Sequence, residues 1–159
     1  MSGFINALDN LEAYVLANGP YDGVIAYSQG AGLAAMLLVR RMMLHPQETP
    51  LFKCAVLFSP LQVYDPVAYV ERGEVNVLRE LPEGVQQLPI PVTVIYGEDD
   101  EKRDEAEGLQ LLCHPSMLSV YMHGGGHEVP GVNAQANGLR ETVKMARRAI
   151  TMAELGVVA

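Results

Sequence analysis

A serine at position 28 is the residue best placed to act as a nucleophile. It lies in the segment Ala-Tyr-Ser-Gln-Gly (26–30), a variant of the Gly-x-Ser-x-Gly nucleophile elbow with alanine in place of the first glycine. In such an elbow the serine sits on a tight turn between a strand and a helix, where small neighbours permit a strained backbone. Because serine is also common at helix N-termini, the alternative that Ser28 only caps the following helix stays open.

An acid and a histidine follow the serine along the chain. Residues 97–100 read Gly-Glu-Asp-Asp and residues 123–130 read His-Gly-Gly-Gly-His-Glu-Val-Pro, and each segment comes directly after an apolar, strand-like run. A histidine that is oriented by a carboxylate can take the proton of a serine hydroxyl and so activate it. The order nucleophile, acid, histidine therefore predicts a triad of Ser28, Asp100 and His127.

Two further residues, each next to a member of the predicted triad, belong to the predicted site. The backbone N–H of Gln29, at the positive end of the following helix, points to where an oxyanion would form. Asp99 remains an alternative to Asp100, because spacing alone does not separate two neighbouring aspartates. Asp99 and Asp100 can also be plain turn residues after a strand.

Metal and cofactor sites are not indicated. His123 and His127 have the spacing His-x-x-x-His, but the three glycines between them do not favour a helical face, and no third ligand is evident. Residues 30–32, Gly-Ala-Gly, lack the remaining spacing of a dinucleotide fingerprint, and no phosphate-binding Gly-Lys-Ser/Thr motif is present. We expect neither a metal nor a cofactor.

The elements that must position these residues alternate between strands and helices. Strands are expected at 23–27, 54–58, 92–96 and 118–122, the last three being continuous enough to be buried on both faces. Helices are expected at 4–17, 31–44, 65–81, 104–113 and about 135–155. This alternation predicts an α/β fold with a mostly parallel sheet flanked by helices. No repeat or long linker divides the chain, so residues 1–159 are expected to form a single domain.

Composition excludes several classes of protein. The formal net charge of -8 over 159 residues would repel nucleic acid. The longest uncharged apolar stretch, 30–39, is half of the roughly 20 residues that a transmembrane helix needs. The first residues lack the pattern of a signal peptide, and Cys54 and Cys113 are too few for a disulfide framework. We expect a cytoplasmic protein with reduced thiols and no nucleic-acid or membrane partner.

Three motifs together resemble the fungal FSH-type serine hydrolases of the α/β-hydrolase superfamily. The elbow Gly-Phe-Ser-Gln-Gly-Ala of that family corresponds to residues 26–31, its Gly-x-x-Asp to residues 97–100, and its Gly-Gly-His-x-Val-Pro to residues 125–130. The motifs occur in the family's order and span most of the chain. The resemblance implies a small esterase or thioesterase fold and favours Asp100 over Asp99 as the acid.

The chain departs from the family pattern before the nucleophile. Members of the family place several strands and a loop there, whereas only 27 residues precede Ser28. We therefore expect an N-terminally shortened fold without the loop that normally supplies the second oxyanion donor, a loss that typically costs ~10²–10³ in kcat. The neighbouring early strand is absent too, so residues 23–27 should form an unpaired sheet edge through which the protein self-associates as a homo-oligomer, such as a homodimer.

The resulting functional prediction is a serine hydrolase that cleaves a small ester or an acyl thioester through an acyl-enzyme. If the resemblance extends to the substrate, acyl groups of fungal secondary metabolism are the expected class. Two alternatives stay open at this point. In the first, the chain is an inactive or non-hydrolytic relative that binds a hydrophobic small molecule or a partner protein. In the second, it is an isomerase or cyclase that uses His127 and Asp100 as acid and base without Ser28.

Overall fold

All four predicted strands form, and they pair in parallel in the order β1-β2-β3-β4. The computed structural model describes residues 2–131 and 137–157. The strands are β1 (Gly23–Tyr27), β2 (Cys54–Phe58), β3 (Val92–Gly97) and β4 (Leu118–His123). The helices are α1 (Ser2–Asn18), α2 (Gln29–Leu44), α3 (Pro66–Arg72), α4 (Arg103–Gln110) and α5 (Gly138–Glu154). The predicted α/β fold with a parallel sheet flanked by helices is confirmed.

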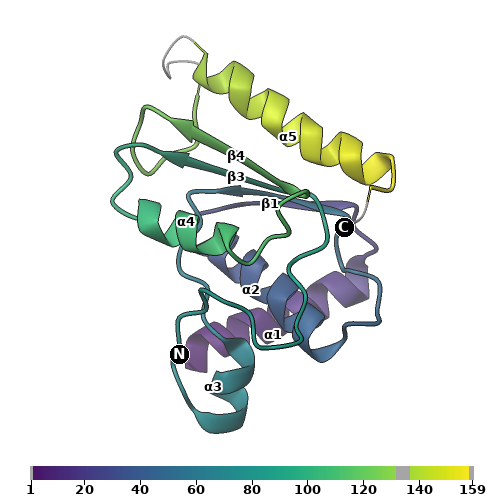
Figure 1. Ribbon diagram of the computed structural model, residues 1–159. Coiled ribbons are helices and arrows are strands. Elements are labelled where there is room, and N and C mark those ends of the chain that lie inside the picture. The colour runs from purple at the N-terminus through teal and green to yellow at the C-terminus, as the bar shows by residue number, and fades with distance from the viewer. Residues whose placement is uncertain (1, 132–136, 158–159) are drawn as a thin grey trace.

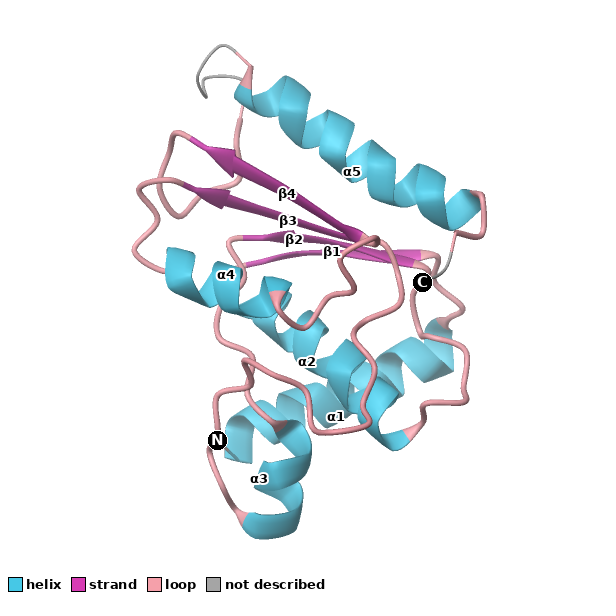
Figure 2. Ribbon diagram, in the orientation of Figure 1, coloured by secondary structure: helices cyan, strands magenta, loops and turns pink. Residues whose placement is uncertain are grey.

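The helices cover the two faces of the sheet unequally (Figures 1 and 2). On one face α5 lies alone and packs on β2, β3 and β4. On the other face α2 packs on β1 and α4 on β3, while α1 and α3 pack on α2 and lie farther from the sheet. Because α5 makes its main contacts with β2, β3 and β4, the face of β1 on the α5 side is the least covered part of the sheet.

Burial follows this arrangement. Every residue of the two central strands β2 and β3 is buried. The prediction that the strand at 118–122 is buried on both faces is wrong: in β4 Val120 and Met122 are 36% and 43% exposed, because β4 is an edge strand. The predicted edge at residues 23–27 is confirmed, since among the described strands β1 pairs with β2 alone, and its Ile25 is 70% exposed.

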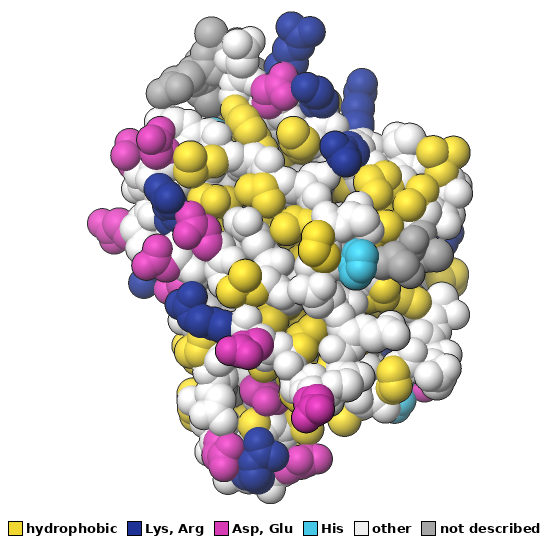
Figure 3. All heavy atoms as spheres, viewed as in Figure 1, with side chains coloured by type: hydrophobic (Ala, Val, Ile, Leu, Met, Phe, Trp, Pro, Cys, Tyr) yellow, Lys and Arg dark blue, Asp and Glu magenta, His cyan; other side chains and the backbone are white. Residues whose placement is uncertain are grey.

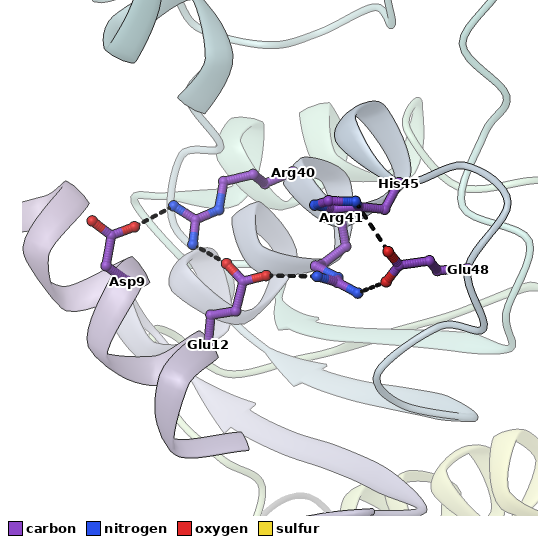
Figure 4. Close-up of polar contacts among 6 residues, drawn as sticks. All are labelled: Asp9, Glu12, Arg40, Arg41, His45 and Glu48. Atoms are coloured by element: carbon purple, nitrogen blue, oxygen red, sulfur yellow. Dashed lines mark hydrogen bonds and ion pairs between the residues drawn. The ribbon is translucent and has the colours of Figure 1, made fainter. Parts of the chain in front are cut away.

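Charged side chains join α1 to α2 (Figure 4). The buried guanidinium of Arg40 in α2 pairs with the carboxylates of Asp9 and Glu12 in α1. Arg41 bonds to Glu12 as well, and on its other side to Glu48 in the loop after α2. A buried guanidinium is tolerated only when it is paired, so these contacts fix the position of α1 against α2. They thereby support the helix whose first turn follows Ser28.

The segment after β2 forms a shorter helix than expected. The Asp65 carboxylate accepts hydrogen bonds from the backbone N–H groups of Val67 and Ala68 at 2.9 and 2.8 Å and so begins α3. The predicted helix over 65–81 is wrong beyond Arg72, because Gly73 adopts a left-handed conformation with φ of 71° that ends it. The predicted start of the last helix, near residue 135, lies outside the described residues.

Figure 3 shows how side chains are distributed on the face seen in Figure 1. Charged side chains of both signs gather at the left and bottom of this view, over α4 and α3, and several Lys and Arg side chains stand at the top, along α5. Hydrophobic side chains reach the surface below the C-terminal part of α5. In the part of the chain that is described, no helix combines the length and the apolar character needed to cross a bilayer.

Candidate active site

Ser28 occupies the junction between β1 and α2 in a conformation that few side-chain-bearing residues adopt. Its φ of 54° and ψ of -123° lie outside the regions that L-residues favour, so the turn is strained, as an elbow requires. Its N–H donates to the Phe58 carbonyl at 2.9 Å and its carbonyl accepts from the Gly32 N–H at 3.1 Å. The Ser28 side chain makes no capping hydrogen bond to α2, which disfavours the helix-cap alternative.

The three side chains expected at the site lie in a hydrogen-bonded line. Ser28 Oγ is 2.8 Å from His127 Nε2, and His127 Nδ1 is 3.0 Å from each carboxylate oxygen of Asp100. Ser28 follows β1, Asp100 follows β3 and His127 follows β4, so the loops after these three strands meet at the carboxyl end of the sheet. In this arrangement Nδ1 can donate to Asp100 while Nε2 accepts the serine proton.

The Asp100 carboxylate is held in its ionised form. Its side chain is fully buried, and burial alone raises its pKa. The hydrogen bonds that it accepts from the Lys102 N–H at 2.8 Å and from His127, together with the nearby Ser59 hydroxyl, outweigh burial and hold the pKa below the ordinary value. A negative charge beside Nδ1 is what stabilises the imidazolium once Nε2 has taken a proton.

Ser59 is a neighbour of the site that the sequence analysis missed. It comes directly after β2, is 1% exposed and has a positive φ of 39°. Among the described residues its hydroxyl has no hydrogen-bond partner of good geometry, but it lies close enough to Asp100 to lower the pKa of that carboxyl. Its place at the carboxyl end of a buried strand, where the other site residues lie, is the signal that could have identified it.

Close backbone contacts join the loops that carry the acid and the histidine. The N–H groups of Glu98 and Asp99 donate to the carbonyls of His123 and Gly125 at 2.7 and 3.0 Å. A Cβ on Gly97 would lie only 2.0 and 2.3 Å from the carbonyl oxygens of Gly125 and Gly126, so only glycine fits at position 97. Glycines on both loops therefore let the two backbones approach closely enough for Asp100 to reach the imidazole.

The two adjacent aspartates differ in their surroundings. Asp99 is exposed and contributes its backbone N–H to the loop contact, whereas Asp100 is buried and directs its carboxylate at His127. Geometry thus separates Asp100 from Asp99, which the spacing of the sequence could not do.

His123, 4% exposed, lies at the end of β4 and its Nδ1 accepts a hydrogen bond from the Gly125 N–H at 3.2 Å.

Tyr27, next to the serine in the elbow, is a second neighbour that the sequence analysis did not single out. Its hydroxyl donates a hydrogen bond to the backbone carbonyl of His127 at 2.7 Å, and the two rings lie with their centroids 5.4 Å apart. The elbow position drew attention to this segment, but the hydroxyl could not be linked to a loop 100 residues away without the fold.

Gln29, the predicted oxyanion donor, is the first residue of α2. The backbone N–H groups of a first helical turn have no partner within the helix, so the N–H of Gln29 is available next to Ser28 Oγ.

Within residues 2–131 and 137–157 no three His, Cys, Asp or Glu side chains gather as a metal site. Cys54 and Cys113 are free and buried, and burial raises the pKa of the Cys113 thiol to about 12.

Comparison with known sequences places this chain among serine hydrolases. Residues 1–139 match the family described as serine hydrolase (FSH1). The chain is 31% identical over 152 residues to Esterase FPY3 of Fusarium mangiferae, an alignment that covers 96% of this chain and 67% of that protein. It is 30% identical over 128 residues to Family of serine hydrolases 2 of Saccharomyces cerevisiae, with 77% and 52% covered. The chain thus spans about half to two thirds of the length of these relatives.

Solved structures give the same fold at lower identity. The monoacylglycerol lipase of Paleococcus ferrophilus matches with a TM-score of 0.61 and 10% identity, covering 93% of this chain and 75% of that one. An esterase of Pyrobaculum calidifontis matches with a TM-score of 0.59 and 19% identity, covering 92% and 60%. At such identities the likeness shows the α/β-hydrolase fold alone.

Proposed function

This chain belongs to the serine hydrolase (FSH1) family, and from that premise we propose that it hydrolyses small esters or acyl thioesters with Ser28 as the nucleophile. The observation that carries the proposal is the 2.8 Å contact between Ser28 Oγ and His127 Nε2, in line with the contact between His127 and Asp100. A serine that is hydrogen-bonded to a carboxylate-oriented histidine is the arrangement that acyl transfer requires.

The first half of the reaction forms an acyl-enzyme. His127 Nε2 takes the proton of Ser28 as Oγ attacks the acyl carbonyl carbon, and the carbonyl oxygen becomes an oxyanion. The tetrahedral intermediate then collapses, the bond to the alcohol or thiol breaks, and the imidazolium returns its proton to that leaving group. Ser28 now carries the acyl group as an ester.

The second half releases the acid. His127 takes a proton from a water molecule, which attacks the acyl carbon, and the proton passes to Ser28 Oγ as the acyl–oxygen bond breaks. Asp100 stays ionised throughout, because its pKa lies below the ordinary value, and stabilises each imidazolium state. The Gln29 N–H at the start of α2 donates a hydrogen bond to the oxyanion in both halves.

The proposed substrates are short or medium acyl esters, or acyl chains carried as thioesters in fungal secondary metabolism. Support for an ester comes from the relatives named Esterase FPY3, from Fusarium mangiferae, and Esterase OVCA2, from Bos taurus, to which the chain is 31% and 26% identical. A thioester is an equally suitable acyl donor for the same Ser28–His127 pair, because the thiolate is the better leaving group.

A substrate panel tests this function. We expect wild-type protein to release product from p-nitrophenyl esters or acyl thioesters whose acyl chains have about 2–12 carbons. We expect Ser28→Ala to lose that activity by about 10⁴-fold or more. An isomerase or cyclase that uses His127 and Asp100 alone would keep its activity in Ser28→Ala. Hydrolysis that survives this substitution would overturn the proposed role of Ser28.

We also propose that the chain self-associates through the edge of β1, with a second copy of the chain as the partner. The free backbone groups of an edge strand can pair with another strand, and two copies of one edge can do so around a two-fold axis. Ile25, 70% exposed, lies on this edge, and the neighbouring Lys53 and Asp22 neutralise each other in an ion pair of 2.7 Å. The net negative charge of the chain is therefore not concentrated at this edge.

A cytoplasmic location and one domain over residues 1–159 complete the proposal. The two free, buried cysteines suit a reducing compartment. The single sheet, to which β1, β2, β3 and β4 all contribute, supports the description as one domain.

A further inference from the structure

The imidazole of His127 must be held over a long span. Ser28 and His127 follow the two opposite edge strands, β1 and β4, and the four strands of a sheet span roughly 14 Å from the first to the last at about 4.8 Å spacing. A loop that reaches back across the sheet must be fixed at its far end, because a misplacement of about 1 Å in a reacting group can cost about 10²-fold in rate.

The near end of that loop is well anchored. The carbonyls of His123 and Gly125 accept hydrogen bonds from the loop that carries Asp100. Three glycines at 124–126 follow the strand, and glycine leaves the backbone more conformational freedom than any other residue. The Glu128 N–H also donates to the Gly126 carbonyl at 2.9 Å across His127, but this contact lies within the same loop and does not join that loop to β1.

The far end is joined to β1 by a tyrosine. The Tyr27 hydroxyl donates to the His127 carbonyl at 2.7 Å, and Tyr27 directly precedes Ser28. The serine that gives up the proton and the backbone of the histidine that takes it are thus joined through one residue of the same strand.

We propose that Tyr27 is a positioning residue, whose hydroxyl fixes the His127 backbone so that Nε2 stays within hydrogen-bond distance of Ser28 Oγ. The inference rests on the proposed function of Ser28 and His127. It adds a second connection between β1 and the histidine loop besides the Ser28–His127 contact itself. Because Tyr27 acts through His127 and not on the acyl group, it changes the rate of the chemical step and not the binding of the acyl chain.

The variant Tyr27→Phe removes the hydroxyl and keeps the ring beside the imidazole. Tyr69→Phe in α3, far along the chain from the site, is the matched control. With a fluorophosphonate as the probe, we expect Tyr27→Phe to lower the maximal labelling rate by about three- to tenfold, the loss of one hydrogen bond. The half-saturating probe concentration should stay as in the wild type, and Tyr69→Phe should behave like the wild type in both. Equal rates for Tyr27→Phe and the wild type would overturn the proposal while leaving the function of Ser28 intact.

A second measurement does not depend on activity and so separates the two proposals. The exchange rates of the backbone amides at residues 126–128 can be followed by nuclear magnetic resonance in both tyrosine variants. We expect faster exchange, by about three- to tenfold, in Tyr27→Phe alone, because the histidine loop has lost one of its two connections to β1. Unchanged exchange would overturn the positioning role even if the wild-type protein failed to react with the probe.

Discussion

The two ends of the sheet differ in how closely their side chains and loops are packed. At its carboxyl end, loops after β1, β3 and β4 bring Ser28, Asp100 and His127 into one hydrogen-bonded line, supported by close backbone contacts. At its amino end, beside β1, a groove of about 830 Å³ lies between the strand and the C-terminal part of α5, lined by side chains that include Ile25, Ile150 and Val157. The groups that carry chemistry are tightly packed, while the scaffold next to β1 is open.

The interactions that the chemistry needs lie at the carboxyl end of the sheet. The line of three side chains depends on the elbow at Ser28, on the burial of Asp100 and on the glycine contacts between two loops, all of which lie within the described sheet and its loops. None of these contacts involves the groove beside β1. Substitutions at the carboxyl end should therefore change chemistry, whereas substitutions at the β1 edge should change association.

After loss of the nucleophile itself, the largest effect should come from the buried acid. Asp100→Asn replaces the charge that stabilises the imidazolium and leaves an amide that can favour the wrong tautomer of His127, so we expect kcat/KM for ester hydrolysis to fall by about 10³–10⁴-fold. The adjacent Asp99→Asn should stay within about twofold of the wild type, because the Asp99 side chain is exposed and its backbone N–H makes the loop contact. Equal losses in the two variants would show that the acid is wrongly assigned.

The next largest effect should come from the backbone contact between the loops. Gly97→Ala would place a methyl group 2.0 Å from the Gly125 carbonyl oxygen, so we expect a loss of about 2–3 kcal/mol in the free energy of unfolding and about 10²-fold in hydrolysis. Gly30→Ala, where a Cβ meets nothing within 4 Å, is the control and should leave stability within about 0.5 kcal/mol. Chemical denaturation of both variants decides the matter. A fully stable Gly97→Ala protein would contradict the tight approach of the two loops.

A smaller effect is expected from pH. The pKa of Asp100 is lower in the folded protein than its ordinary value of 3.8, so the ionised carboxylate stabilises the fold at pH values above about 4. That contribution is lost as the pH falls through the folded-state pKa. The difference in the free energy of unfolding between the wild type and Asp100→Asn should therefore shrink as denaturation is measured at successively lower pH below about 4. A difference that grew on acidification would contradict the ionised, hydrogen-bonded state of Asp100.

The smallest effect on chemistry should come from the β1 edge. Ile25→Lys places a charge on the open edge, and we expect it to shift sedimentation of the protein at micromolar concentration from dimer to monomer while labelling of Ser28 stays unchanged. Leu16→Lys, at another exposed hydrophobic residue in α1, is the control and should leave association as in the wild type. A wild-type protein that sediments as a monomer would refute self-association through this edge.

The sequence predicts the fold well because the signals that define it are local. Apolar runs such as those at 54–58 and 92–97 are buried on both faces in the structure, and the sheet edge expected at residues 23–27 is present. The prediction over 65–81 failed because the helix ends where Gly73 adopts a positive φ, a local conformation that overrides the apolar residues beyond it. Full burial of residues 118–122 failed because their position at an edge is a property of the whole sheet.

The candidate site was predicted as residue types in order, and its contacts were not. The order of elbow, acid and histidine indicates Ser28, Asp100 and His127, and the structure brings these three side chains together. The contributions of Ser59 and Tyr27 depend on long-range pairing of strands and loops, which no spacing along the chain encodes. Contacts of this kind become visible only when β1, β2, β3 and β4 are placed side by side.

The most direct test of the account is the reaction of Ser28 with a fluorophosphonate, followed by intact mass and by peptide mapping, for the wild type and Ser28→Ala. Only a serine that is activated by a neighbouring base reacts rapidly with such a probe. We expect one covalent adduct in the wild-type protein, on the peptide that contains Ser28, and none in Ser28→Ala. Absence of an adduct in the folded wild type, or an adduct that persists in the variant, would contradict the central claim that Ser28 and His127 form a working nucleophile and base.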